Sequence, residues 1–284
     1  MHDEICRERF DLDDGIRSPQ LLSSASPPPT RLRRFRSSRV SPRSYSAEPI
    51  RRALAANELE CTVCSILPEG MNPVSDDAEI RRRTRQHLVD TIKVTADLGS
   101  TLMGGPVYSP VGYLPGRRRT SDEWKWAVEC FQTLGEPLQQ NGITLALEPL
   151  NRFETYFLNI AADAIKLCTE INHPSIGVLL DTFHTNIEEK DVAAAFHQTG
   201  TMLKHVHACE NDRGIPGTGH VDFVGIAAAL KHIGYAGWIT IESFGYSHKE
   251  LAAAAAIWRD LAPTPEAVAF DGLPFLNRTF RSEV

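Results

Sequence analysis

The sequence predicts an α/β fold, a (β/α)8 TIM barrel, and three observations support this prediction. Short apolar runs recur along the chain, and segments with helical periodicity separate them. The runs are almost wholly aliphatic or aromatic, as expected of parallel strands that are buried on both faces. Four of these runs are closed by acidic or imidazole side chains, at Glu148, Asp181, His207 and Glu242.

The chain length suits a single barrel with an added N-terminal segment. There are 284 residues, 42% of them hydrophobic, and a barrel takes about 250 residues. Between Ser18 and Ser46, Ser, Pro and Arg fill most positions, and Asp and Glu are absent. Such a segment buries too little apolar surface to offset its ordering entropy. We therefore expect residues 1–46 to be atypical, either disordered or aberrant, and residues 47–284 to form the barrel domain.

The first half of the domain alternates helices with strands. Asp76 or Asp77 is expected to cap a long helix, because a carboxylate there can accept the first free backbone N–H groups. A long loop over 108–119 follows a strand, and loops in this position shape the pockets of barrels. The predicted helices are 48–56, 76–98 and 124–138, and the predicted strands are 59–66, 101–107 and 145–148.

The second half continues the alternation. Asn159 and Asp222 are expected to cap two of its helices. Residues 182–189 are expected to form a loop over the mouth of the barrel, and the glycines within 214–219 indicate a tight or mobile loop. The predicted helices are 159–171, 191–200, 222–234 and 251–261, and the predicted strands are 176–181, 203–207 and 238–242.

Six strands can be assigned from residue 59 onward, so a closed barrel of eight requires two more within residues 1–46. No segment there has a convincing strand pattern. We expect either poor strands that tertiary packing rescues, or a barrel with one open edge and unpaired backbone groups. A shifted reading frame upstream of about residue 46 is a further hypothesis, because the composition changes abruptly at that point.

The strand ends predict a metal site. The C-terminal ends of all strands in a parallel barrel open onto one face, and neighbouring strands lie about 4.8 Å apart. Glu148, Asp181, His207 and Glu242 should therefore converge. Three carboxylates and one imidazole favour Mn²⁺ or Mg²⁺, while Co²⁺ and Zn²⁺ stay open. We expect Mn²⁺. His205 shares the strand face of His207 and is expected to be structural.

Composition disfavours several other functions. The net charge is −6, and the sequence indicates no coherent basic surface outside the N-terminal segment, which argues against a nucleic-acid partner. No run approaches the roughly 18 apolar residues of a membrane span. Six scattered cysteines without a secretory signal indicate reduced thiols and a cytoplasmic protein. Cys61 and Cys64 point to opposite faces of a predicted strand, so a redox or metal role for this pair is disfavoured.

Three motifs stand out by residue type and spacing. They are Glu148 with Asn151-Arg152-Phe153-Glu154, Asp181-Thr182-Phe183-His184 with Asn186-Ile187-Glu188-Glu189, and His207 with Glu210 and Arg213. With these motifs, the chain from about residue 50 to 260 resembles the ketose 3-epimerases, the D-tagatose, D-psicose and L-ribulose 3-epimerase group of the xylose-isomerase-like TIM barrels. The resemblance implies roles in metal binding for Glu148, Asp181, His207 and Glu242, in proton exchange for Glu148 and Glu242, and in sugar binding for Glu154, His184 and Arg213.

This chemistry follows from the expected site. Epimerisation next to a ketone removes a weakly acidic proton, and a metal ion stabilises the enediolate as charge develops. One glutamate can abstract the proton and the other can return it from the opposite face. We expect an isomerase that inverts carbon 3 of a free ketose, with a sugar as its partner and a homodimer or homotetramer as its assembly. The alternatives are a related sugar isomerase, a dehydratase, a C-glycoside-cleaving lyase or a non-catalytic sugar-binding barrel.

Overall fold

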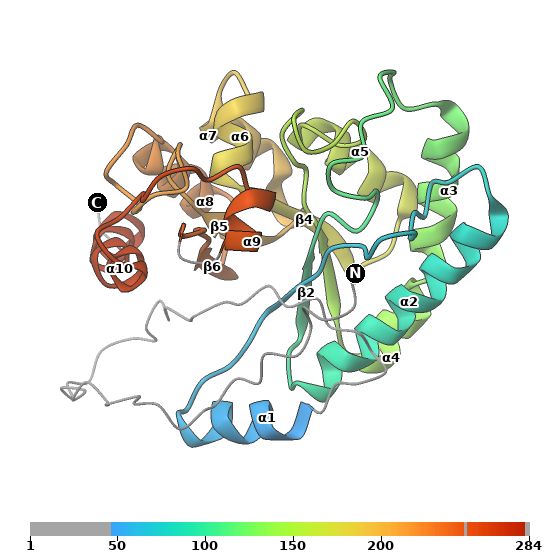
Figure 1. Cartoon of the computed structure of the whole chain (residues 1–284), viewed down its shortest axis with the longest axis horizontal. Helices are drawn as coiled ribbons and strands as arrows, with labels where there is room; N and C mark the ends of the chain where they lie inside the picture. Colours follow the sequence, from blue (N-terminus) through green and yellow to red (C-terminus); the bar gives the residue numbers. More distant parts are fainter. Residues whose placement is uncertain (1–46, 247–248, 282–284) are drawn as a thin grey trace.

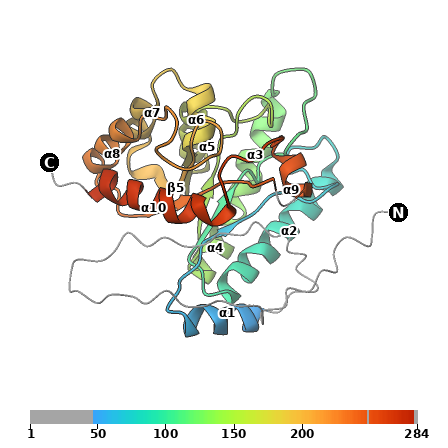
Figure 2. The same cartoon turned by 60° about the vertical axis from the view of Figure 1, so that its left-hand side comes forward.

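The computed structural model describes residues 47–246 and 249–281. Its centre is a parallel sheet of six strands in the order β1-β2-β3-β4-β5-β6, so each strand pairs with its neighbours in sequence. Helices lie outside the curled sheet in both views (Figure 1, Figure 2). The predicted α/β barrel architecture is confirmed, and the described strands form the larger part of the barrel.

The strands are short and mostly buried. Side chains alternate between the two faces of a strand, so Ala146 and Leu179 share a face with Glu148 and Asp181, two residues further on. Ala146 and Leu179 contact each other and Leu102 inside the barrel. The strands are β1 Val63–Cys64, β2 Leu102–Gly105, β3 Thr144–Leu147, β4 Ile176–Asp181, β5 Leu203–Ala208 and β6 Trp238–Ile241.

Helices α2, α3, α5, α7 and α8 bury apolar residues, whereas α1 has no buried residue. Asp77 caps α2 and Asp222 caps α8, as predicted, and each carboxylate accepts a backbone N–H of the first turn. The helices are α1 Ala47–Ala56, α2 Ala78–Asp97, α3 Ser121–Gln132, α4 Gly135–Asn141, α5 Ala161–Ile171, α6 Thr182–Glu188, α7 Val192–Thr199, α8 Phe223–His232, α9 Lys249–Ala254 and α10 Pro265–Arg281.

Two predictions in the first half are wrong in extent. The strand expected over 59–66 is only β1, which pairs with β2 as its one described neighbour. The helix expected over 124–138 is interrupted between α3 and α4. The Thr133 hydroxyl there donates to the Cys130 carbonyl, and a hydroxyl bonded to nearby backbone competes with regular helix.

Two predictions around the barrel mouth are also wrong. Asn159 does not cap α5, because its amide donates to the Leu150 and Thr155 carbonyls instead. The N-cap is Ile160, and the Glu189 carboxylate accepts the Ala161 N–H from a distant part of the chain. The loop expected over 182–189 is largely helix α6, because the Asp181 carboxylate accepts the Phe183 N–H and starts it.

The C-terminal part differs from the prediction as well. The helix expected over 251–261 is shorter and shifted, and forms α9. Beyond it, α10 packs against α8, where the rings of Phe275 and Phe280 meet Phe223 edge-on. None of the helices in the described parts of the chain has both the length and the apolarity needed to cross a bilayer.

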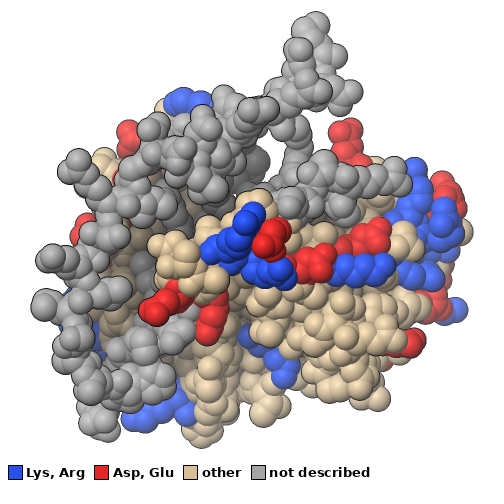
Figure 3. Space-filling view, turned by 90° about the horizontal axis from the view of Figure 1, so that it is seen from below, with Lys and Arg blue, Asp and Glu red and all other residues tan. Residues whose placement is uncertain are grey.

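The described surface carries charges of both signs close together. On α1, Arg51 and Arg52 pair with Glu48 at 2.6 Å and 3.4 Å. Figure 3 shows basic and acidic side chains interspersed on the face seen from below. The two further strands expected within residues 1–46 fall outside the described residues, and the domain boundary at residue 46 stays a prediction.

Candidate metal centre

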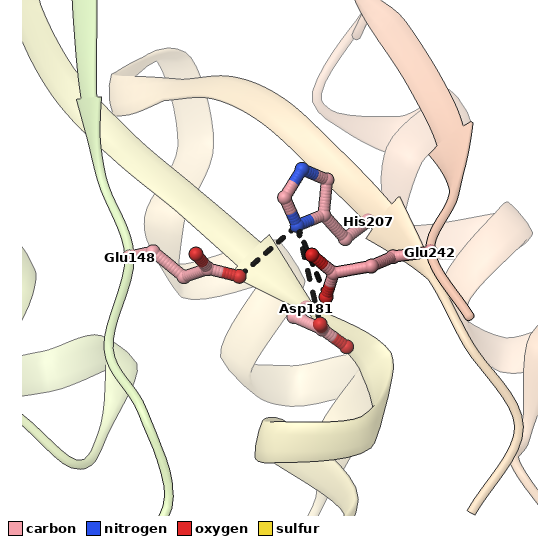
Figure 4. A group of neighbouring side chains, drawn as sticks. All are labelled: Glu148, Asp181, His207 and Glu242. Carbon is pink, nitrogen blue, oxygen red and sulfur yellow. Dashed lines mark hydrogen bonds and ion pairs between the residues drawn. The ribbon is translucent and has the colours of Figure 1, made fainter. Parts of the chain in front are cut away.

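Four side chains from consecutive strands converge at the barrel mouth (Figure 4). Glu148 follows β3, Asp181 ends β4, His207 lies in β5 and Glu242 follows β6. Their ligand atoms all lie within 4.8 Å of one another. The parallel register explains the convergence, because Asp181 pairs with His207 across the ladder. The structure therefore brings together the four residues that the strand ends predicted.

One imidazole nitrogen faces all three carboxylates. His207 Nδ1 lies 3.0 Å from Glu148 Oε1, 3.6 Å from Glu242 Oε2 and 4.0 Å from Asp181 Oδ2. One nitrogen and three carboxylate oxygens thus surround a common point. This donor set is oxygen-rich and lacks a thiolate, which suits a hard divalent cation.

Burial makes the negative charge of this cluster difficult to hold. It raises the pKa of Glu148, and it raises the pKa of Asp181 to about 8. Burial also disfavours the charged imidazole, but Glu242 and Glu148 outweigh it and raise the pKa of His207 to about 9. For Glu242, burial is outweighed by His207 and Arg213, and the pKa falls. The carboxylates therefore depend on nearby positive charge, and a divalent cation fits that requirement.

Arg213 supplies positive charge to the cluster. Its Nη1 donates to Asp181 Oδ2 at 2.8 Å and also to Glu242 Oε2. The guanidinium lies over the rings of Phe183 and Phe244, which hold its plane. Arg213 has a φ of 69°, a left-handed conformation that few non-glycine residues adopt. This strained backbone directs the side chain into the mouth of the barrel.

The three residues expected to bind sugar form a continuous line with Asn151. Arg213 Nη2 lies 3.1 Å from His184 Nε2, and His184 Nδ1 lies 2.9 Å from Asn151 Nδ2. The Asn151 amide also donates to Glu154 Oε1 at 2.8 Å. Burial and Arg213 lower the pKa of His184 well below its usual range, so its imidazole is neutral. The line begins at Arg213, which contacts Asp181 and Glu242, and ends at Glu154.

Two buried side chains that were not among the predicted site residues contact the backbone of Glu148 and Glu242. The Tyr108 hydroxyl donates to the Glu148 carbonyl at 2.8 Å and fixes the backbone of that residue. The Cys209 thiol donates to the Glu242 carbonyl at 2.7 Å. Tyr108 directly follows the strand predicted over 101–107 and Cys209 lies two residues beyond His207, so proximity to strand ends was the signal available for both.

Glu210 organises the loop that carries Arg213. Its carboxylate accepts three backbone N–H groups of that loop, from Asn211, Gly217 and Val221. The carboxylate is buried, so these charge-assisted hydrogen bonds are shielded from water. The Glu210 carboxylate therefore fixes the conformation of this loop.

The chain is similar in sequence and in structure to known ketose 3-epimerases. A family model described as xylose isomerase-like TIM barrel matches residues 27–269. A probable ketose 3-epimerase of Synechocystis sp. is 41% identical over 224 residues, which cover 79% of this chain and 78% of that protein. A ketose 3-epimerase of Arthrobacter globiformis is 34% identical over 226 residues, 78% of this chain and 77% of that protein. The crystal structure of a D-allulose 3-epimerase from Methylomonas sp. in complex with D-allulose superposes with a TM-score of 0.81 at 29% identity, covering 85% of this chain and 84% of that one.

Proposed function

We propose that this chain, which belongs to the xylose isomerase-like TIM barrel family, inverts carbon 3 of a free ketose with a divalent metal ion. The chain is an epimerase of the isomerase class that acts on sugars, since ketose 3-epimerases match most of its length. The proposal of metal-dependent inversion at carbon 3 rests on the convergence of three carboxylates and one imidazole at four consecutive strand ends.

We assign Glu148, Asp181, His207 and Glu242 as the metal ligands. The assignment is supported by their mutual distances, their oxygen-rich chemistry and the burial of Glu148, Asp181 and His207. Mn²⁺ is the proposed ion, with Mg²⁺ and Co²⁺ as alternatives. A divalent ion at this position supplies a Lewis acid that makes the proton next to a ketone easier to remove.

Two glutamates carry the proton in this proposal. Inversion needs a proton acceptor on one face of the carbon and a proton donor on the other. Glu148 and Glu242 come from β3 and β6, and Figure 4 shows them approaching His207 from opposite sides. One glutamate abstracts the proton to form an enediolate, and the other returns a proton from the far side. Each such step is worth about 10² to 10⁴ in rate, and the direction of reaction decides which residue acts first.

Glu154, His184 and Arg213 are the proposed sugar-binding residues. The line of polar contacts that they form with Asn151 begins beside Asp181 and Glu242, so a ketose could extend along it. A guanidinium donates, a carboxylate accepts and a neutral imidazole can do either, which suits the hydroxyls of a sugar. This line is the feature that supports their assignment.

The loop after β5 favours a free ketose over a phosphorylated one. Barrels commonly hold phosphate through backbone N–H groups near the last strands. Here the N–H groups of Asn211, Gly217 and Val221 are bonded to the Glu210 carboxylate, which would also repel a phosphate. A higher kcat/KM for ketose phosphates than for free ketoses would reverse this assignment.

A substrate panel tests the proposed reaction. The purified protein, supplied with Mn²⁺, is incubated with D-psicose, D-tagatose, L-ribulose and their phosphates, and the products are separated by chromatography. The expected product is the carbon-3 epimer of a free ketose. An aldose product would instead indicate an aldose–ketose isomerase, and bound metal without turnover on any sugar would indicate a binding protein.

Several expectations about the whole chain stay predictions. They are a cytoplasmic location, a homodimer or homotetramer, and the lack of nucleic-acid and membrane partners. The barrel domain over 47–284 also stays a prediction, and the family match begins earlier, at residue 27. Gene sequencing that finds one uninterrupted reading frame, shared by close relatives, would exclude the frame-shift hypothesis for residues 1–46.

A further inference from the structure

Two further side chains that can bind a metal ion lie at the end of the barrel opposite the candidate metal centre. His197 lies in the last turn of α7, and His232 lies in the last turn of α8. Each helix leads into the N-terminal end of the next strand, β5 or β6. The two imidazoles are therefore remote from Glu148 and Asp181, which lie at the C-terminal ends of their strands.

The two rings are close enough to share an ion. Their centroids lie 4.4 Å apart and their planes are tilted by 43°. With metal–nitrogen bonds of about 2.1 Å and angles of about 90° to 110° at the metal, two imidazole centroids lie about 4.5 to 5.2 Å apart. The observed separation lies just below this range, so the side-chain torsion angles of His197 or His232 must change for a nitrogen of each ring to contact one ion.

The surroundings leave both rings accessible. They are exposed and line a groove of about 390 Å³ between α7 and α8, where small residues such as Ala194 and Ala228 leave space. Figures 1 and 2 both show the two helices side by side. Within the described parts of the chain, neither imidazole has a hydrogen bond or an ion pair that would compete with a metal.

We propose that His197 and His232 form a second metal site, which binds one divalent metal ion such as Zn²⁺, with water molecules as the remaining ligands. Asp191 also lines the groove, but it caps the first turn of α7 and accepts the Ala194 N–H, whereas His197 lies in the last turn. Two imidazole ligands favour Zn²⁺, Cu²⁺ or Ni²⁺ over Mn²⁺ and Mg²⁺. The C-terminal ends of α7 and α8 also meet here, and the partial negative charge of each helix end favours a cation. The preference is therefore opposite to that of the acidic cluster at the barrel mouth.

Counting bound ions tests the proposal. Zn²⁺ is titrated by calorimetry into chelator-treated wild type, His197→Gln, His232→Gln and the control His220→Gln, which removes a single exposed imidazole from a loop. His197→Gln and His232→Gln should each bind one Zn²⁺ fewer per chain than wild type, irrespective of the number of Zn²⁺ ions that the acidic cluster binds. The control His220→Gln should bind the same number of Zn²⁺ ions as wild type. Loss of a direct ligand should weaken this site by more than the about 10- to 100-fold that loss of an outer hydrogen-bond partner produces.

Imidazole nitrogen NMR identifies the ligands independently of stoichiometry. In wild type, Zn²⁺ should shift the ring nitrogens of His197 and His232 together, and replacing either histidine should abolish the shift of the other. Melting curves of the variants without metal verify that they fold. Unchanged Zn²⁺ binding in both variants, or Zn²⁺ shifts that bypass these two rings, would overturn the proposal.

Discussion

The buried carboxylate of Glu123 and the carboxylates of the candidate metal centre are neutralised in different ways. Glu123, in the first turn of α3, accepts hydrogen bonds from both terminal nitrogens of Arg117, from the Thr120 N–H and from the Tyr156 hydroxyl. In the candidate metal centre, three carboxylates share one guanidinium and one imidazole. Glu123 is neutralised entirely by groups of its own chain and stabilises the fold, and we call Glu123 with Arg117, Thr120 and Tyr156 the brace. In the candidate metal centre the carboxylates outnumber the nearby cationic groups, which suits the binding of an external ion.

The pKa values follow this difference. Burial opposes the ionisation of Glu123, but its hydrogen bonds to Arg117, Thr120 and Tyr156 outweigh burial and lower the pKa to about 2. At the barrel mouth, burial instead raises the pKa of Glu148 and Asp181. The brace is thus neutralised by its own chain, whereas under the proposed function a metal ion neutralises the acids at the barrel mouth.

The largest expected effect concerns catalysis. Glu148→Gln and Glu242→Gln each keep an oxygen that can contact a metal but remove the group that carries the proton. Each change should lower kcat by at least about 10², the scale of losing a general acid or base. The matched control is Glu123→Gln, the same substitution in the brace, which should leave kcat near the wild-type value. Near wild-type turnover in either active-site variant with metal bound would contradict the two-glutamate proposal.

The next effect concerns the guanidinium at the barrel mouth. Arg213→Met removes the cation that contacts Asp181 and Glu242, and breaking a buried ion pair costs about 3 to 5 kcal/mol of unfolding free energy. The loss should be largest in metal-free protein and smaller when a divalent ion supplies the missing charge. Urea denaturation with Mn²⁺ and with chelator measures both values. Equal destabilisation in the two conditions would show that Arg213 acts independently of the metal.

A metal ion should stabilise the fold measurably. An ion that binds only the folded state adds about 2.7 kcal/mol when its concentration is 100 times its Kd. Addition of Mn²⁺ to chelator-treated protein should therefore raise the melting temperature, and Asp181→Asn should reduce that rise. A melting temperature and an activity that are both indifferent to chelator would contradict the metal-site assignment.

The smallest effect concerns the brace. Glu123→Gln should lower the free energy of unfolding at pH 7 by about 1 to 3 kcal/mol, the scale of hydrogen bonds to charged groups. The folded-state pKa of Glu123 lies below its ordinary value of 4.5, so its stabilisation is present above that pH. It is lost as the pH falls from about 4.5 toward 2. Urea denaturation of wild type and variant should therefore converge in this window, and a difference independent of pH would contradict the ionic origin.

Some features of the fold and of the candidate metal centre could be predicted from the sequence. The strand ends at Glu148, Asp181 and His207 were readable, because an apolar run closed by a polar residue marks the strand and parallel strands share one open face. The caps Asp77 and Asp222 were readable from local side-chain chemistry. These features depend on neighbours within a few positions along the chain.

Contacts between distant segments were not readable in the same way. The Glu189 carboxylate caps α5 from 28 residues away, and Arg213 reaches the cluster through a left-handed backbone conformation that its residue type does not favour. Thr120 and Glu123 have the spacing of a capping box, but Tyr156 joins them only through the tertiary fold. Local patterns therefore predicted the convergence of the four side chains, while the groups that neutralise and orient them required the structure.

The most direct test of the proposed function is solvent exchange at the reacting carbon. Wild-type protein with Mn²⁺ is incubated with its ketose in D₂O, and the product is examined by NMR. A proton that passes through Glu148 and Glu242 exchanges with solvent, so the product ketose should carry deuterium at carbon 3, and the Gln variants should slow its appearance at least about 100-fold. A product epimer without solvent deuterium at carbon 3 would contradict proton exchange by these two glutamates.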